Sequence, residues 1–203
     1  MIGIINYGLG NLKSIQNIIK HVGGNCRIIS SISEMEDIKK IILPGVGSFD
    51  HGMKGLHKGN WIEPLNNLVL KNKMPVLGIC LGMQLMCKSS EEGKLSGLGW
   101  IDAEVKLFDI PNGTNLKIPH MGWNTIKIMK RNSILEIEQE EQRFYFVHSY
   151  HAVCNESNDV LALTNHGDNI IAAFSHNNIF GVQFHPEKSH KFGMQLFKKF
   201  IEL

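Results

Sequence analysis

Short apolar runs alternate with helically spaced apolar residues through the first half of the chain, and this alternation restricts the fold more than any other feature. The apolar runs occupy residues 1–6, 25–30, 40–43 and 75–79. Between the first two runs, apolar residues from Leu12 to Val22 recur every three or four positions and stop before two glycines, as in a helix. Strands that alternate with helices are typical of βαβ units, so we predict an α/β fold with a centrally parallel sheet and helices on both faces.

The second half of the chain has a different pattern, in which β-prone runs dominate. These runs cover residues 101–108, 125–129, 144–147, 160–164, 170–175 and 179–184. We expect them to form an antiparallel extension packed beside the first sheet. Residues 190–203 place large apolar side chains at helical spacing and predict a closing amphipathic helix. We see no repeat and no linker, so we expect residues 1–203 to form a single domain.

Charge and cysteine content exclude several classes of partner. Twenty-one Lys and Arg against nineteen Asp and Glu leave a formal charge of +2, which gives no electrostatic reason to expect nucleic acid or an anionic membrane. No apolar run approaches the roughly 20 residues of a membrane helix. The four cysteines lack metal-ligand or disulfide spacing, and no dinucleotide fingerprint or phosphate loop occurs. We therefore expect no metal, no cofactor and a reducing, cytoplasmic compartment.

Residues 76–84, with the sequence VLGICLGMQ, place a cysteine at a predicted strand-to-helix turn. Glycines two positions before and after Cys80 permit the sharp turn that exposes a nucleophile. The N–H groups and the dipole of the following helix favour the thiolate form of the side chain. From this segment alone, a buried packing role for Cys80 is the alternative, since isolated cysteines are usually core residues.

Residues 181–189, with the sequence GVQFHPEKS, supply a base and a group to orient it. A cysteine nucleophile needs both. We expect extended backbone here, in which side chains two residues apart face the same side, so that Glu187 approaches the imidazole of His185. A solvated surface turn is the alternative. However, His185 follows an apolar strand as Cys80 does, which favours one shared site.

Acyl transfer also needs N–H donors for the developing oxyanion. The N–H of Leu81, directly after the nucleophile, is the expected first donor. The strand-to-loop junction at residues 43–49 (LPGVGSF) is a candidate for the second, because its glycines let the backbone approach a ligand closely. Taken by itself, this junction would be an ordinary turn.

Together these segments resemble the class I glutamine amidotransferases, a family with a Cys-His-Glu triad. The resemblance rests on GICLGMQ at 78–84 and GVQFHPEKS at 181–189, and it extends over the whole chain. Further segments resemble the branch of the family that serves histidine biosynthesis: NYGLGNLKS at 6–14, LPGVGSFDHGM at 43–53, EEG at 91–93, PHMGWN at 119–124 and FVHSY at 146–150. The resemblance implies a three-layer, flavodoxin-like fold.

The resemblance also implies roles for single residues. Cys80 would attack the side-chain amide of glutamine to give a glutamyl thioester and ammonia, while His185 transfers the proton and Glu187 orients the imidazole. Leu81 would donate one N–H to the oxyanion, and Val46 or Gly47 would donate the other. The residues implied around the glutamine are Gly45, Gly47, Gln84, Glu92, His148, Ser149 and Tyr150. The residues implied at a partner interface and the ammonia exit are Asn11, Pro119, His120, Met121, Trp123, Asn124 and Lys188.

A partner that consumes the ammonia is a further implication, because ammonia released into water is mostly protonated and lost as a nucleophile. The resemblance implies a (β/α)8-barrel synthase subunit in a heterodimer, on which completion of the oxyanion site would depend. The alternative within the family is a glutaminase subunit for another synthase, such as one that amidates a sugar for surface glycans. Outside the family, the alternatives are a non-catalytic scaffold, which the intact triad disfavours, and a cysteine peptidase or γ-glutamyl hydrolase.

Overall fold

An eight-stranded sheet forms the centre of the computed structural model, which describes residues 1–109, 116–136 and 140–203. Its strands lie in the order β2 (Cys26–Ile29), β1 (Ile2–Ile5), β3 (Lys40–Leu43), β4 (Val76–Ile79), β13 (Ile179–Val182), β12 (Asn169–His176), β11 (Val160–Asn165) and β8 (Lys127–Ile128). From β2 to β13 all pairings are parallel, and beyond β13 they are antiparallel. The predicted α/β fold with a mixed, centrally parallel sheet is therefore confirmed.

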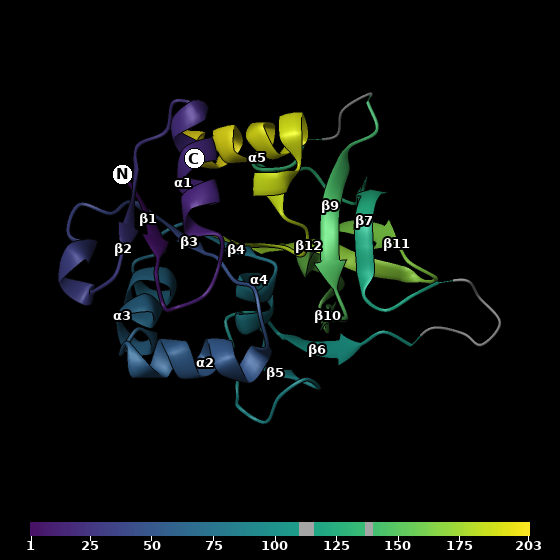
Figure 1. The fold of residues 1–203 in the computed structure, drawn as a ribbon, viewed down its shortest axis with the longest axis horizontal. Coiled ribbons are helices and arrows are strands. Elements are labelled where there is room, and N and C mark those ends of the chain that lie inside the picture. The colour runs from purple at the N-terminus through teal and green to yellow at the C-terminus, as the bar shows by residue number, and fades with distance from the viewer. Residues whose placement is uncertain (110–115, 137–139) are drawn as a thin grey trace.

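Helices cover both faces of this sheet, so the molecule has three layers (Figure 1). The helices on one face are α1 (Leu12–His21) and α5 (His190–Glu202). Those on the other face are α2 (Phe49–Lys58), α3 (Ile62–Asn66), which continues as a π-helix over Asn67–Lys71, and α4 (Leu81–Leu85). Short 3₁₀ turns lie at Ile32–Met35, Ser157–Asp159 and Pro186–Lys188. No helix in the described part of the chain has the length and apolarity needed to cross a bilayer.

The core lies between these layers as two apolar clusters, one on each face of the sheet. The cluster beneath α2, α3 and α4 includes the fully buried Phe49, Leu65 and Leu85. The cluster beneath α1 and α5 includes Ile19 and Phe197. Because the central strands are covered on both sides, β1, β3 and β4 are almost continuously apolar rather than alternating, as parallel sheets require.

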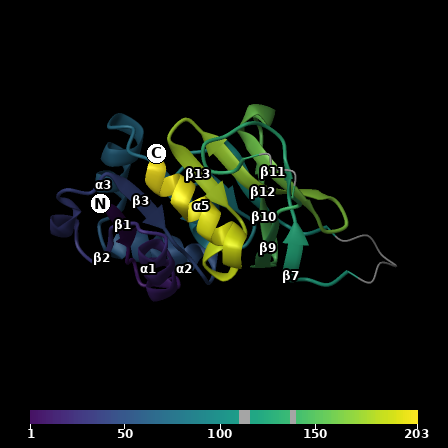
Figure 2. The same ribbon diagram turned by 90° about the horizontal axis from the view of Figure 1, so that it is seen from above.

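Two smaller sheets extend the molecule at the end away from the N-terminus (Figure 2). One consists of β10 (Tyr150–Cys154), β6 (Ala103–Leu107) and β5 (Ser89–Ser90). The other is a two-stranded ribbon of β7 (His120–Thr125) and β9 (Arg143–His148). Phe144 and Phe146 of the ribbon are fully buried in the cluster beneath α1 and α5, which fixes the ribbon against the main body.

The structure corrects the expectation that all late strands form one antiparallel extension. The strand predicted at residues 179–184 pairs in parallel with β4, with Gly181 opposite Gly78, and only its other edge is antiparallel. The strands predicted at 101–108 and 144–147 belong to the smaller sheets. The helix predicted after Cys80 is short and ends at Leu85, since the carbonyls of Met86 and Cys87 accept hydrogen bonds from the chain near Trp100 instead.

Candidate active site

Three neighbouring parallel strands end at the same edge of the central sheet. Leu43 of β3 lies opposite Gly78 of β4, and Gly78 lies opposite Gly181 of β13. The segments that follow these strands, at 44–47, 80–84 and 183–187, therefore converge. This edge, at the carboxyl ends of parallel strands, is where open α/β sheets bind their ligands.

Cys80 lies at a sharp turn between β4 and α4. It is the N-cap residue of α4 and has a φ of +51°, a backbone conformation that is rare and strained for any residue other than glycine. The two flanking glycines are needed because the backbones come very close together. A Cβ at position 82 would lie 1.8 Å from the carbonyl oxygen of Leu43, and one at position 78 would lie 2.8 Å from the backbone of Gly82. This arrangement matches the predicted nucleophile turn.

His185 and Glu187 follow β13 and are in direct contact. Nδ1 of His185 lies 2.8 Å from Oε1 of Glu187, and both side chains are almost completely buried. The expected extended backbone was wrong, because Pro186–Lys188 forms a 3₁₀ turn that brings the carboxylate back toward the ring. Ser189 stabilises this turn, since its Oγ donates a 2.6 Å hydrogen bond to the carbonyl of His185.

One buried atom on each side chain of this pair has no hydrogen-bond partner among the described residues. Among the described residues, Nε2 of His185 and Oε2 of Glu187 have no hydrogen-bond partner, although both are buried. Asn11 donates from Nδ2 to Oε1 of Glu187 at 3.4 Å, so it lies behind the carboxylate. Burial acts to lower the pKa of His185, but the adjacent Cys80 thiolate and Glu187 carboxylate outweigh it and raise the pKa to about 10. At neutral pH the imidazole is therefore protonated beside the nucleophile.

A cavity of about 360 Å³ opens at this edge of the sheet. Its lining residues are Val46, Gly47, Cys80, Leu81, Gln84, Glu92, Pro119, Val147, His148, Ser149, Tyr150 and His185. Most of the residues that the sequence analysis placed in the catalytic, oxyanion and glutamine groups thus meet around one space. Val147 was not predicted, because it continues the apolar pattern of β9 and carries no chemical signal.

Gly45, expected near the substrate, instead packs against α4 and does not line the cavity. A Cβ at this position would lie 2.7 Å from the Cβ of Leu81 and 2.7 Å from the hydroxyl oxygen of Tyr7. The Tyr7 hydroxyl donates a hydrogen bond to the carbonyl of Pro44 and so fixes the start of the 44–47 segment. Burial, aided by the Cys80 thiolate, raises the pKa of Tyr7 far above its ordinary value, so the hydroxyl keeps its proton. Tyr7 was missed because it lies near the N-terminus, far in sequence from the other site residues.

Glu92 joins two loops of the cavity wall. Its Oε2 accepts a 2.8 Å hydrogen bond from the backbone N–H of Phe49, at the start of α2. A carboxylate at a helix N-terminus is favourable because it satisfies a free N–H group and faces the positive end of the helix dipole. Glu92 therefore fixes the loop that follows β3 at the same time as it lines the cavity.

One cavity-lining residue, His148, forms a hydrogen-bonded pair with a second histidine, His120. Nδ1 of His120 lies 3.0 Å from Nε2 of His148, and Nδ1 of His148 lies 2.8 Å from the carbonyl oxygen of Tyr150. Nδ2 of Asn124 lies 3.1 Å from Nε2 of His120. Burial lowers the pKa of His148 to about 3 and that of His120 to about 4, so both are neutral at pH 7. His120 and Asn124, predicted at the partner interface, therefore have internal contacts that support the cavity wall.

Of the other residues predicted at the interface, Pro119 lines the cavity, whereas Met121, Trp123 and Lys188 lie outside it. Met121 is 62% exposed and Trp123 is 43% exposed, both on β7. The Trp123 ring stacks on His190 with centroids 5.4 Å apart. Nζ of Lys188 lies 5.5 Å above the ring of Tyr145. These side chains form an aromatic and cationic surface beside the turn that carries Glu187.

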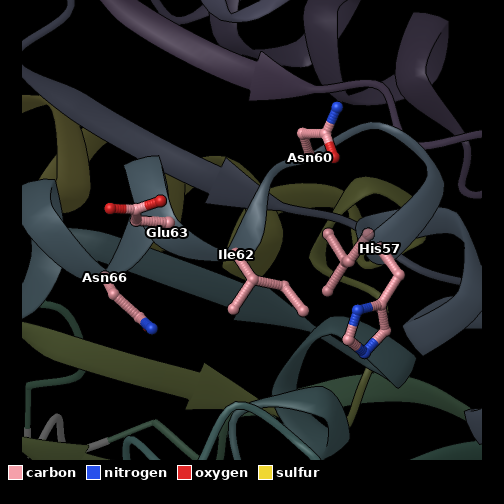
Figure 3. A pocket seen from close by; sticks show the side chains of 6 residues that line it. His57, Asn60, Ile62, Glu63 and Asn66 are labelled. Atoms are coloured by element: carbon pink, nitrogen blue, oxygen red, sulfur yellow. The ribbon is translucent and has the colours of Figure 1, made fainter.

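A second cavity of about 360 Å³ lies between α2 and α3 (Figure 3). It is lined by Leu56, His57, Asn60, Ile62, Glu63 and Asn66. These residues include no cysteine or serine, and they lie toward the C-terminal end of α2, whereas its N-terminal end adjoins Glu92. Cys80 and His185 line the first of these two cavities and are absent from the lining of the second.

Comparison with known protein families and sequences gives consistent results over the whole chain. The family model described as glutamine amidotransferase class-I matches residues 3–203. A Pseudomonas aeruginosa protein named imidazole glycerol phosphate synthase subunit HisH 2 is 46% identical over 100% of both chains. A Methanococcus maripaludis protein of the same name is 48% identical over 100% of this chain and 99% of its own.

Solved structures with the same fold are more distant in sequence. A structure described as PurLQS from Thermotoga maritima superposes with a TM-score of 0.74 at 17% identity, covering 99% of this chain and 97% of its own. A structure described as a glutamine amidotransferase gives a TM-score of 0.74 at 16% identity, covering 100% and 99%. At these identities the likeness establishes the fold.

Proposed function

The chain belongs to the class I glutamine amidotransferases, and from this premise we infer that it is the glutaminase subunit of an imidazole glycerol phosphate synthase in histidine biosynthesis. It hydrolyses glutamine to glutamate and ammonia, and it works with a synthase subunit that uses the ammonia. Three relatives from Leptospira and Methanococcus species, each named as subunit HisH of imidazole glycerol phosphate synthase, are 43–48% identical over the full chain.

We propose that the first half-reaction is attack of the Cys80 thiolate on the side-chain carbonyl carbon of glutamine. A sulfur–carbon bond forms and the carbonyl oxygen becomes negatively charged. The N–H of Leu81 and an N–H from Val46 or Gly47 stabilise this charge. Nε2 of protonated His185 then gives its proton to the amide nitrogen, the carbon–nitrogen bond breaks, and ammonia leaves a glutamyl thioester.

The second half-reaction is hydrolysis of the thioester. Neutral His185 takes a proton from water while the water oxygen attacks the thioester carbon. The carbon–sulfur bond breaks, glutamate leaves, and the Cys80 thiolate and the protonated imidazole are restored. Glu187 acts through its 2.8 Å contact with Nδ1, which fixes the orientation of the ring and stabilises its positive charge.

One observation carries this mechanism: a buried imidazole nitrogen without a hydrogen-bond partner faces the same cavity as a strained cysteine. His185 Nε2 has no partner within the described residues, although an unsatisfied buried polar atom is costly. The Cys80 backbone is held in an unfavourable conformation at the start of a helix. Both costs are expected at a site that forms its best contacts with a reacting substrate.

We propose that the synthase partner is a (β/α)8 barrel that docks on the surface formed by Met121, Trp123 and Lys188. This surface contains large exposed apolar and aromatic side chains, which are typical of protein interfaces. Pro119 belongs to the same run as Met121 and Trp123 and lines the cavity, so it lies where ammonia would pass toward the partner. The cysteines of the described residues are free thiols, which is consistent with our proposal of a cytoplasmic location.

The test of this function is glutamine hydrolysis by the purified chain, alone and mixed with the barrel subunit of an imidazole glycerol phosphate synthase and its phosphoribulosyl-formimino ribotide substrate. We expect strong stimulation in the mixture. The Cys80→Ala variant provides the control, because it should abolish glutamine-dependent synthesis and leave synthesis from added ammonia intact. Loss of both activities would mean that Cys80 is structural.

High hydrolysis by the chain alone without stimulation would keep the chemistry and overturn the assigned pathway. The same assay with a barrel partner that amidates sugars would then identify the alternative synthase. Cleavage of peptides by the isolated chain would instead indicate a hydrolase with a different substrate class.

A further inference from the structure

Gln183 is a fully buried amide directly after β13, and its exposed fraction is 0%. Its position continues the face of β13 that carries Ile179, a residue of the apolar core. An amide buried at such a position is costly unless its polar atoms are hydrogen-bonded. Both ends of Gln183 are bonded: Oε1 accepts from Nε2 of Gln84 at 3.0 Å, and Nε2 donates to Sγ of Cys80 at 3.6 Å.

The backbone carbonyl of Tyr150 determines the orientation of the Gln183 amide, and it acts through the side chain of Gln84. Nε2 of Gln84 lies 3.0 Å from the carbonyl oxygen of Tyr150, which can only accept a hydrogen bond. Gln84 must therefore present its NH2 group in this direction, and the same NH2 group lies beside Gln183. The facing atom of Gln183 is then the accepting Oε1, so its own NH2 group points at the sulfur.

A hydrogen-bond donor that points at the Cys80 sulfur stabilises the thiolate more than the neutral thiol. A hydrogen bond to the charged form of a group stabilises that form. The neutral thiol accepts hydrogen bonds only weakly, so a fixed N–H beside Sγ favours the thiolate. The same contact restricts the direction of the sulfur, because the amide is held by α4 and β13 and does not depend on a bound substrate.

We propose that Gln183 is a positioning residue, which uses its side-chain N–H to hold the Cys80 sulfur as a directed thiolate before glutamine arrives. This inference rests on the proposed glutaminase function, because a directed thiolate matters only if Cys80 is the nucleophile. The effect of Gln183 on the sulfur can be measured without glutamine. The titratable groups near the sulfur are His185 after β13, Tyr7 after β1 and Glu92 of the cavity wall. Sequence patterns alone do not indicate this role, since Gln183 stands between two large apolar residues at the end of a strand.

The decisive experiment measures the rate of Cys80 alkylation by iodoacetamide against pH in the free full-length chain, with mass spectrometry of the peptide that contains Cys80. Gln183→Glu keeps the size of the side chain and still accepts from Gln84, but it replaces the donor with a negatively charged oxygen. Gln183→Met keeps the length and removes the donor. We expect the midpoint of the rate profile to rise by at least about one pH unit in Gln183→Glu, which is a tenfold loss of reactivity below the midpoint, and by a smaller amount in Gln183→Met.

Gln142→Glu is the matched control, because it makes the same change at another buried amide, whose Nε2 donates to the carbonyl of Glu136. Its profile should coincide with that of the unsubstituted chain. An equal shift in Gln142→Glu would overturn the proposal, since the effect would then be a general one of buried charge. Unshifted profiles in folded Gln183→Glu and Gln183→Met would overturn it directly.

Gln84→Met keeps the proposal testable if a substitution at position 183 prevents folding. Without Gln84 the hydrogen bond that fixes the direction of the Gln183 amide is lost, so we expect an intermediate shift, and an unchanged profile would contradict the proposal. Failure of the proposed function looks different. In that case the unsubstituted chain would show a reactive Cys80 that depends on Gln183, yet no barrel partner would stimulate glutamine hydrolysis.

Discussion

Burial lowers the pKa of the His185 imidazole, but two negatively charged neighbours together raise it by more. Burial favours the neutral ring, whereas the Cys80 thiolate and the Glu187 carboxylate favour the protonated one and raise the pKa to about 10. The unfolded chain has no such neighbours, and there the pKa is about 6.5. The protonated ring therefore stabilises the fold fully below about pH 6.5, and this contribution is lost as the pH rises toward 10.

We predict that Cys80→Ala lowers the pKa of His185. The variant removes the thiolate and leaves the burial, so the balance shifts toward the neutral ring. Titration of the His185 ring protons by NMR measures the change, and the resonance of the exposed His21 on α1 reports any general effect. An unchanged titration of His185 would show that Glu187 alone sets its charge.

At the scale of secondary-structure elements, the site depends on how closely α4 packs against the ends of β3 and β4. Gly82 permits this contact, because the backbone of the first turn of α4 reaches the carbonyl of Leu43. Gly78 permits the chain to turn back over its own strand. The cysteine stands between these two contacts, so its position is determined by backbone packing rather than by its own side chain.

We predict that Gly82→Ala destabilises the fold by about 1–3 kcal/mol and lowers partner-stimulated glutamine hydrolysis. The added Cβ would lie 1.8 Å from the Leu43 carbonyl oxygen, so β3 and α4 must move apart. Urea unfolding measures the change. Gly3→Ala is the comparison, because its Cβ would meet side-chain carbons of Ile29 and Ile38 at 3.1 Å rather than a backbone oxygen at 1.8 Å, and it should cost less. Equal costs would show that the contact of α4 with β3 can relax.

At the scale of the whole molecule, the β7–β9 ribbon stands beside the three-layer body (Figures 1 and 2). The residues that line the cavity come from both parts. The body contributes the nucleophile and the base, the ribbon contributes Val147 and His148, and Pro119 directly before β7 also lines the cavity. The outer side of the same ribbon carries Met121 and Trp123. A partner bound to this outer surface would therefore be separated from the cavity by a single layer of backbone.

We predict that Met121→Lys weakens binding to the synthase barrel by at least about tenfold, because a charge would be buried at the interface. The free chain should change in stability by no more than about 0.5 kcal/mol, since this side chain is 62% exposed. Calorimetric titration and urea unfolding measure the two effects. Met129→Lys, at a methionine 48% exposed beyond β8, is the matched control and should bind normally. Equal weakening by both would move the interface away from the ribbon.

The sequence by itself determined the α/β class, the turn at Cys80 and the presence of His185 and Glu187 after a strand. These features are encoded within about ten residues, in apolar spacing and in glycines that only a sharp turn requires. It did not predict α2, because Phe49–Lys58 contains two glycines and two histidines, or β7, whose six residues include only two large apolar ones, Met121 and Trp123. Both elements owe their form to packing against the rest of the molecule.

Only the tertiary structure decided which strands are neighbours and which polar groups meet. The insertion of β13 in parallel beside β4 joins strands about a hundred residues apart, and that pairing places the end of one beside the end of the other. Gln183 and Cys80 are separated by 103 residues, and Tyr7 and Pro44 by 37. Contacts at such separations leave no periodic pattern in the sequence, because each depends on how the whole chain closes around its core rather than on the residues beside it.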